Sequence, residues 1–261
     1  MNNGQGEYRR NIRLLVAYDG TDFSGWQRQK SGSGAAARTV QGEIEAALER
    51  IHQCPTALAG SGRTDSGVHA AGQVANFRSS IKNMEARRFV PALNGLLPRD
   101  IRILEARETR PDFHARFDAK SRTYRYYFVC GRRAMPWELR YSLQLWRRPR
   151  LERLNDYARL LPGELDCSVF AVPGDKSKSR NRYISQACFF AEGDRLVFEI
   201  SANAFLWKMV RSIAGTILHY EEKGLDGPGF KEILASRNRS LAGPTAPPEG
   251  LFLWKIDYYR D

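Results

Sequence analysis

The chain has 261 residues, 42% of them hydrophobic and 11% aromatic, so it can bury a sizeable core as one large domain or two modest ones. Lysine and arginine number 41 against 29 acidic residues, a formal charge of +12, which favours a polyanionic partner and says nothing about the fold. The N-terminus has no apolar core typical of a signal peptide, and no apolar run approaches the ~20 residues that span a bilayer. We therefore expect a cytoplasmic protein with no membrane partner.

The first half of the chain predicts strands around one helix. Residues 12–18 alternate apolar and polar side chains and run into the turn-rich DGTDFSG, which indicates a strand followed by a loop. The glycine-rich stretch 30–38 is predicted to be a flexible loop, and Thr39 then caps a helix over 40–53. Further short strands are predicted at 55–60, 73–77 and 101–107.

The second half has a similar order. We predict strands at 123–129 and 251–258, a hairpin over 186–201, helices at 151–161 and 229–236, and a long helix over 204–220 capped by Asn203. Both halves thus run strand, helix, strand, strand, which predicts an α+β fold of two related halves, 1–115 and 116–261, around a mainly antiparallel mixed sheet. No repeat is visible in the sequence itself, so this prediction rests on element order.

The four cysteines, Cys54, Cys130, Cys167 and Cys188, are widely scattered along the chain. They form no CxxC pair and have no histidine at metal-ligand spacing. Structural zinc is therefore not expected, and reduced thiols are the simpler interpretation.

The segment GSGRTDSGVHA, residues 60–70, is the most informative part of the sequence. Its glycines indicate a tight loop whose backbone can approach a ligand closely, and it carries Arg63 and Asp65 two residues apart. It matches neither a Walker loop nor a dinucleotide fingerprint. An ordinary surface turn with a local ion pair is the alternative. His69 is interpreted as a hydrogen-bonding group that fixes the loop.

Two further segments carry candidate functional residues. Alternation along 123–129 places Tyr124, Tyr126 and Phe128 on one strand face, where they could stack on bases or simply belong to the core. Arg211 follows Trp207 by four residues, so the predicted long helix would carry both on one face. Such an arginine usually reaches to solvent, and it gains interest only beside a buried acid.

Seven segments, in this order along the chain, carry a resemblance to a known family: YDGTDFSGWQRQ (18–29), RTVQGEIEAAL (38–48), GSGRTDSGVHAAGQVANF (60–77), ALNGLLPRDIRI (92–103), FHARFDAKSRTYRY (113–126), NAFLWKMVRSIAG (203–215) and AGPTAPPEGLFLWKIDY (242–258). The chain resembles the tRNA pseudouridine synthase A family, and RTDSGVHA is its most specific block. The resemblance implies the pseudouridine synthase fold, a homodimer that clamps one tRNA, and no cofactor. The implied substrates are uridines of the anticodon stem-loop, at tRNA positions 38–40 in the family.

The resemblance also implies roles for single residues. Asp65 takes the place of the catalytic aspartate, and Arg63 that of the arginine that helps to hold the flipped nucleotide. Tyr124 takes the place of the tyrosine that stacks on the target base, and Arg211 that of the arginine paired with the catalytic acid. The sequence departs from the family in the longer loop 30–38 and in GDKSKSRNR, residues 174–182.

Two alternatives remain at this point. A non-catalytic RNA-binding protein of RRM-like topology would explain the charge and the aromatic strand, but it has no need for an acid in a glycine-rich loop. A metal-dependent nuclease would need a cluster of carboxylates or histidines. Asp19, Asp22 and Asp65 are the only local candidates and have an unpersuasive spacing, so no metal is expected.

Overall fold

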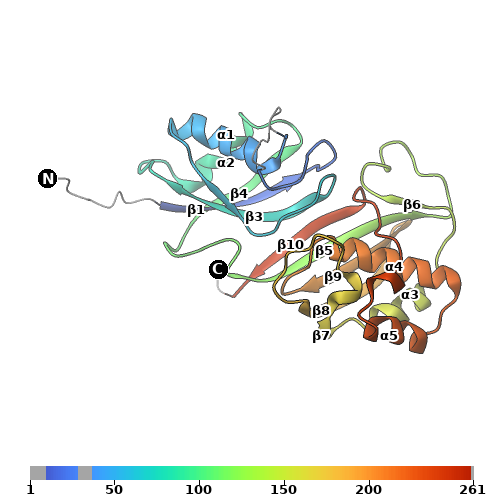
Figure 1. Ribbon diagram of the computed structural model, residues 1–261. Coiled ribbons are helices and arrows are strands. Elements are labelled where there is room, and N and C mark those ends of the chain that lie inside the picture. Colours follow the sequence, from blue (N-terminus) through green and yellow to red (C-terminus); the bar gives the residue numbers. More distant parts are fainter. Residues whose placement is uncertain (1–9, 29–36, 260–261) are drawn as a thin grey trace. The chain divides into compact units, whose positions relative to one another are not determined.

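The computed structural model describes residues 10–28 and 37–259, which form two compact units (Figure 1). The first unit comprises the described residues of Met1–Lys120 and of Ile256–Asp261, and the second comprises Ser121–Lys255. Each unit combines helices with mostly antiparallel strand pairs, which confirms the predicted α+β class. The predicted loop over 30–38 lies almost wholly outside the described residues.

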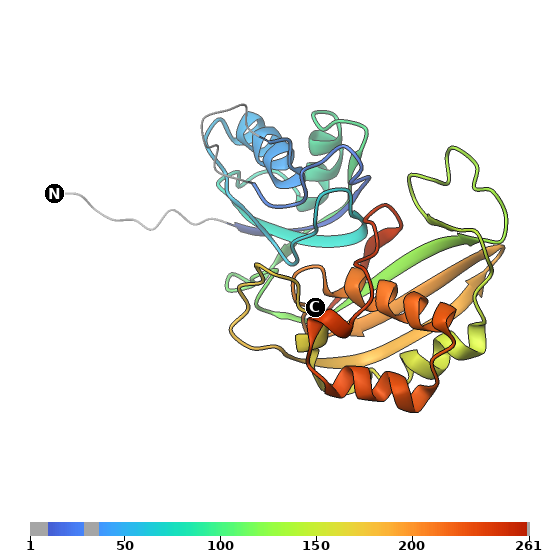
Figure 2. The ribbon, with the colours of Figure 1, turned by 45° about the vertical axis from the view of Figure 1, so that its right-hand side comes forward.

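The first unit is built on three antiparallel strands in the order β4-β1-β3, with the short β2 paired to β3. These strands are β1 (Arg10–Tyr18), β2 (Leu58–Gly60), β3 (His69–Ser79) and β4 (Ile101–Thr109). Helices α1 (Val40–His52) and α2 (Phe89–Asn94) lie together on one face of them, with a 3-10 turn at Ala86–Arg88 before α2 (Figure 2).

Burial explains why the sequence forms β1 and α1. Along β1 the buried apolar side chains occupy every second position, from Ile12 to Tyr18, as expected of a strand with one face on the core. Along α1 the buried stripe includes Val40, Ile44 and Leu48. The Thr39 hydroxyl accepts a hydrogen bond from the Gly42 backbone N–H at 3.3 Å, so the predicted cap is confirmed.

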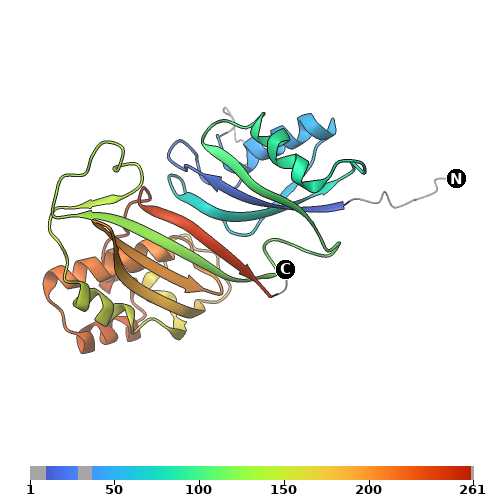
Figure 3. The same ribbon diagram turned by 180° about the vertical axis from the view of Figure 1, so that it is seen from behind.

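The second unit is built on strands in the order β10-β5-β9-β8-β7, with β6 parallel to β5. The strands are β5 (Ala119–Cys130), β6 (Leu143–Leu145), β7 (Gly163–Asp166), β8 (Asn181–Glu192), β9 (Arg195–Ala202) and β10 (Leu251–Tyr258). Helices α3 (Leu151–Ala158), α4 (Met209–Lys223) and α5 (Gly227–Ala235) form a layer on one face of the strands, and short 3-10 turns occur at Cys167–Phe170 and Arg239–Leu241 (Figure 3).

The beginning of α4 corrects the sequence prediction. The helix starts at Met209, after Lys208 in a left-handed conformation with φ 57 and ψ 12. Asn203 is not its cap, because the Asn203 amide oxygen accepts hydrogen bonds from the backbone N–H groups of Ala204 at 2.8 Å and Tyr183 at 3.1 Å. Trp207 precedes the helix, so it does not share a helix face with Arg211. Local side-chain bonds to the backbone have replaced helical ones here.

The aromatic face of β5 belongs mainly to the core. Tyr126 and Phe128 are fully buried, with ring centroids 4.7 Å apart, so the core interpretation is confirmed for these two residues. Tyr124 lies at the edge, 9% exposed. None of the helices in the described part of the chain combines the length and apolarity that crossing a membrane requires.

Candidate active site

Asp65 lies in the loop 61–68, which connects β2 to β3 and which we call the Asp65 loop. The backbone carbonyl of Asp65 accepts a hydrogen bond from the Val68 N–H at 3.2 Å. Gly67, the third residue of this four-residue turn, has φ +78, as a type II turn requires of its third position. Asp65 is the first residue of this turn and is half-buried. The third position of the turn is one that glycine adopts without strain.

A second segment, residues 19–26, holds the peptide groups on both sides of Asp65. On one side the Trp26 N–H donates to the Thr64 carbonyl at 3.2 Å. On the other side the Phe23 carbonyl accepts from the Ser66 hydroxyl at 3.1 Å and from the Gly67 N–H at 3.4 Å. The backbone position of Asp65 is therefore fixed by its neighbours on either side.

Glycines let these two segments approach. A Cβ at Gly25 would lie 2.7 Å from the Thr64 carbonyl oxygen, and Gly25 has φ +97. A Cβ at Gly20 would lie 2.0 Å from the Val68 carbonyl oxygen. Both distances are shorter than real Cβ contacts, so a side chain at either position would push residues 19–26 away from the Asp65 loop.

The loop is also anchored to strands of its own unit. The Ser61 N–H donates to the Val74 carbonyl at 2.8 Å. The buried Gln73 amide pairs with the backbone of Gly62, donating to its carbonyl at 2.8 Å and accepting from its N–H at 3.3 Å. The hydroxyls of Tyr18 and Thr64 are 2.8 Å apart. Buried polar groups are thus satisfied inside the unit.

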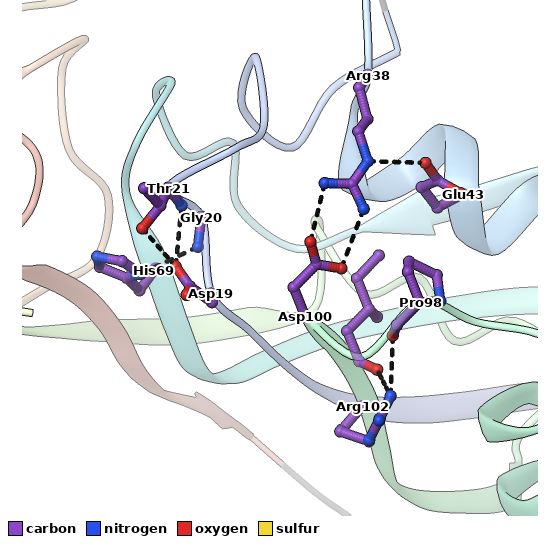
Figure 4. Close-up of polar contacts among 10 residues, drawn as sticks. Asp19, Gly20, Thr21, Arg38, Glu43, His69, Pro98, Asp100 and Arg102 are labelled. Carbon is purple, nitrogen blue, oxygen red and sulfur yellow. Dashed lines mark hydrogen bonds and ion pairs between the residues drawn. The ribbon is translucent and has the colours of Figure 1, made fainter. Parts of the chain in front are cut away.

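His69 fixes the entry to β3, as predicted. Its ring is fully buried, and Nδ1 accepts a hydrogen bond from the Gly20 N–H at 3.0 Å (Figure 4). Asp19 Oδ1 lies 3.2 Å from the same nitrogen, so a backbone N–H and a carboxylate oxygen both lie within hydrogen-bonding distance of it. Asp19 also accepts from the Thr21 N–H and hydroxyl at 3.0 and 2.6 Å. Asp19 therefore has a structural role in this turn.

Arg38, which was not identified from the sequence, stabilises the segment 19–26. Its guanidinium donates to both oxygens of Asp100 at 2.8 and 3.1 Å and to Glu43 at 3.1 Å (Figure 4). It also lies over the Phe23 ring, 4.1 Å from the centroid, and its carbonyl accepts from the Ser24 N–H at 2.8 Å. The hydrogen bond to Asp100 is the largest cause that raises the pKa of Arg38. Arg38 thus joins α1, the turn before β4 and the support of the Asp65 loop.

The exposed Arg63 is oriented by a chain of amide groups. Its Nε donates to the side-chain oxygen of Gln27 at 3.1 Å. Gln27 donates in turn to Gln41 of α1 at 2.5 Å, and Gln41 donates to Glu45 and to the Leu58 carbonyl, both at 3.0 Å. Because the Nε of Arg63 faces Gln27, the opposite edge of the guanidinium points away from these amide groups. Gln27 was also missed, and its place in the resembling segment 18–29 was the only signal.

The other two candidate residues belong to the second unit. Tyr124 of β5 packs edge-on against Phe205, with centroids 5.2 Å apart. Arg211 lies in the first turn of α4. Its side-chain Nε donates to the Ala246 carbonyl at 2.7 Å, and its backbone carbonyl accepts from the Ala246 N–H at 3.1 Å. A Cβ at Gly215 would lie 1.9 Å from the Pro244 carbonyl, so glycine lets this segment run directly along the helix.

Burial is the main influence on the pKa of Tyr126, a neighbour of Arg211. The Tyr126 hydroxyl donates to the Pro247 carbonyl. Desolvation raises the pKa of this phenol far above its usual value, and the charge of Arg211 opposes that shift only weakly. Tyr126 therefore stays neutral and serves as a structural hydrogen-bond donor.

Arg63 and Asp65 thus share one loop of the first unit, whereas Tyr124 and Arg211 lie on neighbouring elements of the second. The pairing of Arg211 with Asp65 stays a prediction. In the described part of the chain, no three His, Cys, Asp or Glu side chains gather as metal ligands would.

Comparison with known proteins identifies the family. The sequence model of the family described as tRNA pseudouridine synthase matches residues 14–118 and 157–259. The chain belongs to the tRNA pseudouridine synthase family. It is 54% identical over 253 residues to tRNA pseudouridine synthase A of Treponema denticola, covering 97% of this chain and 94% of that protein.

Other members give the same result. The chain is 52% identical over 235 residues to the protein of that name from Treponema pallidum, with 90% of this chain and 84% of the relative covered. It is 37% identical over 251 residues to the one from an Exiguobacterium species, with 96% and 99% covered. The resemblance in sequence motifs and the prediction of an RNA-modifying isomerase are therefore confirmed at the level of the family.

Proposed function

We propose that this chain converts uridines of the tRNA anticodon stem-loop to pseudouridine, with the Asp65 carboxylate as its catalytic group. One observation of the structure supports this most directly. Asp65 opens a turn whose flanking peptides are both held by hydrogen bonds from residues 19–26. A carboxylate that must meet one sugar carbon needs such fixed placement, whereas an ordinary surface turn does not.

The reaction asks little of the protein beyond this group. The glycosidic bond between ribose C1′ and uracil N1 breaks, the ring turns, C5 joins C1′, the hydrogen on C5 leaves as a proton, and N1 takes up a proton. Nothing is oxidised or hydrolysed on balance. The carboxylate acts either as the nucleophile at C1′ or as the base that removes a ribose proton, and both routes need it ionised and in place.

The target base must leave the helical stack before it can react, which costs a few kcal/mol. We propose that Tyr124 receives the base on its ring, since base stacking on an aromatic side chain is worth ~1–3 kcal/mol. The edge-on Phe205 holds that ring in position. Arg63, oriented by Gln27, offers its outer guanidinium edge to the flipped nucleotide.

Arg211 completes the proposed site as the counter-ion of Asp65. Its Nε donates to the Ala246 carbonyl, which orients the guanidinium, and a guanidinium can pair with a carboxylate side on. A positive charge close to a carboxylic acid favours the ionised form of that acid.

We further propose that the protein works in the cytoplasm as a homodimer. The loop between β5 and α3 is built on the ion pair of Arg132 with Glu138 at 2.7 Å, which lowers the pKa of Glu138 to about 2. Yet this loop exposes Trp137 at 70% and Trp146 at 76%, together with Met135. Several large apolar groups exposed on one segment favour an interface, and a second copy is the occupant that the family implies.

A non-catalytic RNA-binding protein is the alternative, and one assay separates the two. Transfer RNA carrying tritium at C5 of its uridines is incubated with the enzyme, because rejoining through C5 expels that hydrogen to water. Release by the wild-type protein supports the proposal, and binding without any release would refute it.

A further inference from the structure

Trp207 is an exposed tryptophan with close neighbours on both its backbone and its ring. The side chain is 45% exposed, although the indole is among the most costly groups to leave in water. Its backbone N–H donates to the Asp175 carboxylate at 2.6 Å. A Cβ at Gly174 would lie 3.3 Å from the ring, so the backbone of residue 174 runs directly along the indole edge. The ring is held in place rather than left to move.

Asp175 is the anchor of this arrangement. Its side chain is only 1% exposed, and it also accepts from the Ser177 N–H at 2.8 Å and pairs with Arg180 at 3.2 Å. Burial would raise its pKa, but the hydrogen bonds from Ser177 and Trp207 outweigh burial and lower it. A buried carboxylate thus fixes the backbone that carries an exposed indole, an arrangement that core packing alone does not require.

The side chain of Lys208 places a positive charge over the Trp207 ring. Its ammonium lies 4.3 Å from the centroid of Trp207, a favourable cation–π distance. The residue reaches this place in a left-handed conformation with φ 57, which a lysine rarely adopts. Helix α4 follows with no side-chain cap and no acid in its first turn, so its positive end adds to the same sign of charge.

Cations are frequent in residues 174–182, the segment whose Gly174 lies against the ring. Lys176, Lys178, Arg180 and Arg182 occupy every second position, and Asp175 is the only acid among these nine residues. Because Asp175 pairs with Arg180, the remaining charge of this segment is positive, and Lys176 and Lys178 are exposed. Exposed positive charges beside a flat aromatic ring match a polynucleotide, whose phosphates alternate with bases.

We propose that Lys176, Lys178, Trp207 and Lys208, together the Trp207 surface, bind an unpaired nucleotide of the RNA substrate outside the reacting base. The indole stacks on the base of that nucleotide, and the lysines contact the neighbouring phosphates. This inference rests on the proposed function, since it takes tRNA as the substrate. A protein partner is disfavoured because a lone indole among cations offers little apolar area.

The first test removes the ring. The Kd of unmodified tRNA is measured at fixed salt for Trp207→Ala, Trp207→Phe and the control Tyr259→Ala, which removes another aromatic side chain, 77% exposed. Trp207→Ala should raise the Kd about 5- to 150-fold, the equivalent of ~1–3 kcal/mol. Trp207→Phe should stay near wild type, and so should Tyr259→Ala. At saturating tRNA, kcat should change little in all three.

Fluorescence shows directly whether the ring meets RNA. Quenching of intrinsic fluorescence by tRNA should be smaller in Trp207→Phe than in the wild type, even though the variant still binds. Equal quenching and an unchanged Kd for Trp207→Ala would overturn the proposal, and they would also be the result if the surface served a protein partner. A wild type that binds tRNA but releases no tritium would refute the proposed function alone.

The second test removes charge. The double variant Lys176→Gln/Lys178→Gln should flatten the log–log dependence of binding on salt by about 1.4–1.8, because each phosphate contact contributes about 0.7–0.9. The control Lys223→Gln/Lys231→Gln removes two exposed lysines at the end of α4 and on α5 and should leave the slope unchanged. Equal slopes for the two double variants would place the phosphates elsewhere and contradict the proposal.

Discussion

The Asp65 loop of the first unit and the turn of Trp207 in the second both present a side chain outside regular structure, but different forces hold them. Asp65 is fixed by backbone hydrogen bonds from residues 19–26, which reach it only because Gly25 has no side chain. Trp207 is fixed by one buried carboxylate, Asp175. The first arrangement is sensitive to added volume and the second to lost charge.

This contrast suits the two proposed tasks. A reacting carboxylate has to be placed to a fraction of an ångström, and a rigid backbone frame provides that placement. A stacking platform only has to present a flat ring to a base, so a single anchor is sufficient. The following changes test the contrast, beginning with the largest expected effect.

Gly25→Ala should reduce kcat for pseudouridine formation at least about tenfold, since a 1 Å misplacement of catalytic groups can cost about 100-fold. The methyl group would lie 2.7 Å from the Thr64 carbonyl and push the Asp65 loop aside. Single-turnover kinetics at saturating tRNA measure the effect.

Gly163→Ala is the matched control, because Gly163 has φ +108 but nothing within 4 Å of the added Cβ. Both variants carry the strain of a left-handed alanine, roughly 1–3 kcal/mol of folding stability. Only Gly25→Ala should lose turnover in the folded state. An equal loss of kcat in both would mean that general destabilisation, and not the position of the loop, is responsible.

Asp175→Asn should leave kcat nearly intact and lower the free energy of unfolding by about 1–3 kcal/mol, because Arg180 loses its buried counter-ion. It should also weaken tRNA binding, by less than Trp207→Ala does, as the ring loses its anchor. Denaturant unfolding and binding titrations measure the two effects. A normal stability together with a large loss of kcat would assign Asp175 to catalysis instead.

The pH dependence of this anchor has a definite sign. The pKa of Asp175 is lowered in the folded protein, so its contribution to stability is present above the unfolded pKa near 3.9. That contribution is lost as the pH falls through the lower, folded value. The stability difference between the wild type and Asp175→Asn should therefore be constant at neutral pH and shrink only in strong acid.

Gln27→Leu should produce the smallest change. Arg63 would lose the partner of its Nε, so its outer edge would no longer be held toward the substrate. We expect KM for tRNA to rise a few-fold, roughly 1 kcal/mol, with thermal stability almost unchanged because water can replace the partner of the exposed Arg63. Gln27→Glu, which keeps an acceptor, should stay near wild type; an unchanged KM for Gln27→Leu would remove Gln27 from the site.

The same contrast explains what could be predicted from sequence. Strand β1 and helix α1 follow from local periodicity and a local cap, so their prediction was confirmed. The predicted start of α4 was wrong because the backbone N–H of Trp207 bonds to Asp175, which lies 32 residues away in the sequence. No local pattern records such a bond. Asn203 likewise resembles a cap because its partner Tyr183 lies 20 residues away in the sequence.

The Asp65 loop was found through the chemistry of its side chains, but its support was not. The bond of Arg38 to Asp100 spans 62 residues and that of Arg63 to Gln27 spans 36. The close approach of Gly25 to Thr64 involves only backbone atoms. Distant partners and backbone contacts leave no periodicity in a single sequence, which is why these positions emerged only from the structure.

Tritium release by Asp65→Asn tests the central claim most directly. The substitution keeps the size of the side chain and its place in the turn, while it removes the charge that either catalytic route requires. We predict that release from C5-tritiated tRNA is abolished, while the Kd for tRNA stays within a few-fold of wild type because a carboxylate does not attract phosphate. Near-normal release by Asp65→Asn would contradict the assignment of Asp65 as the catalytic group.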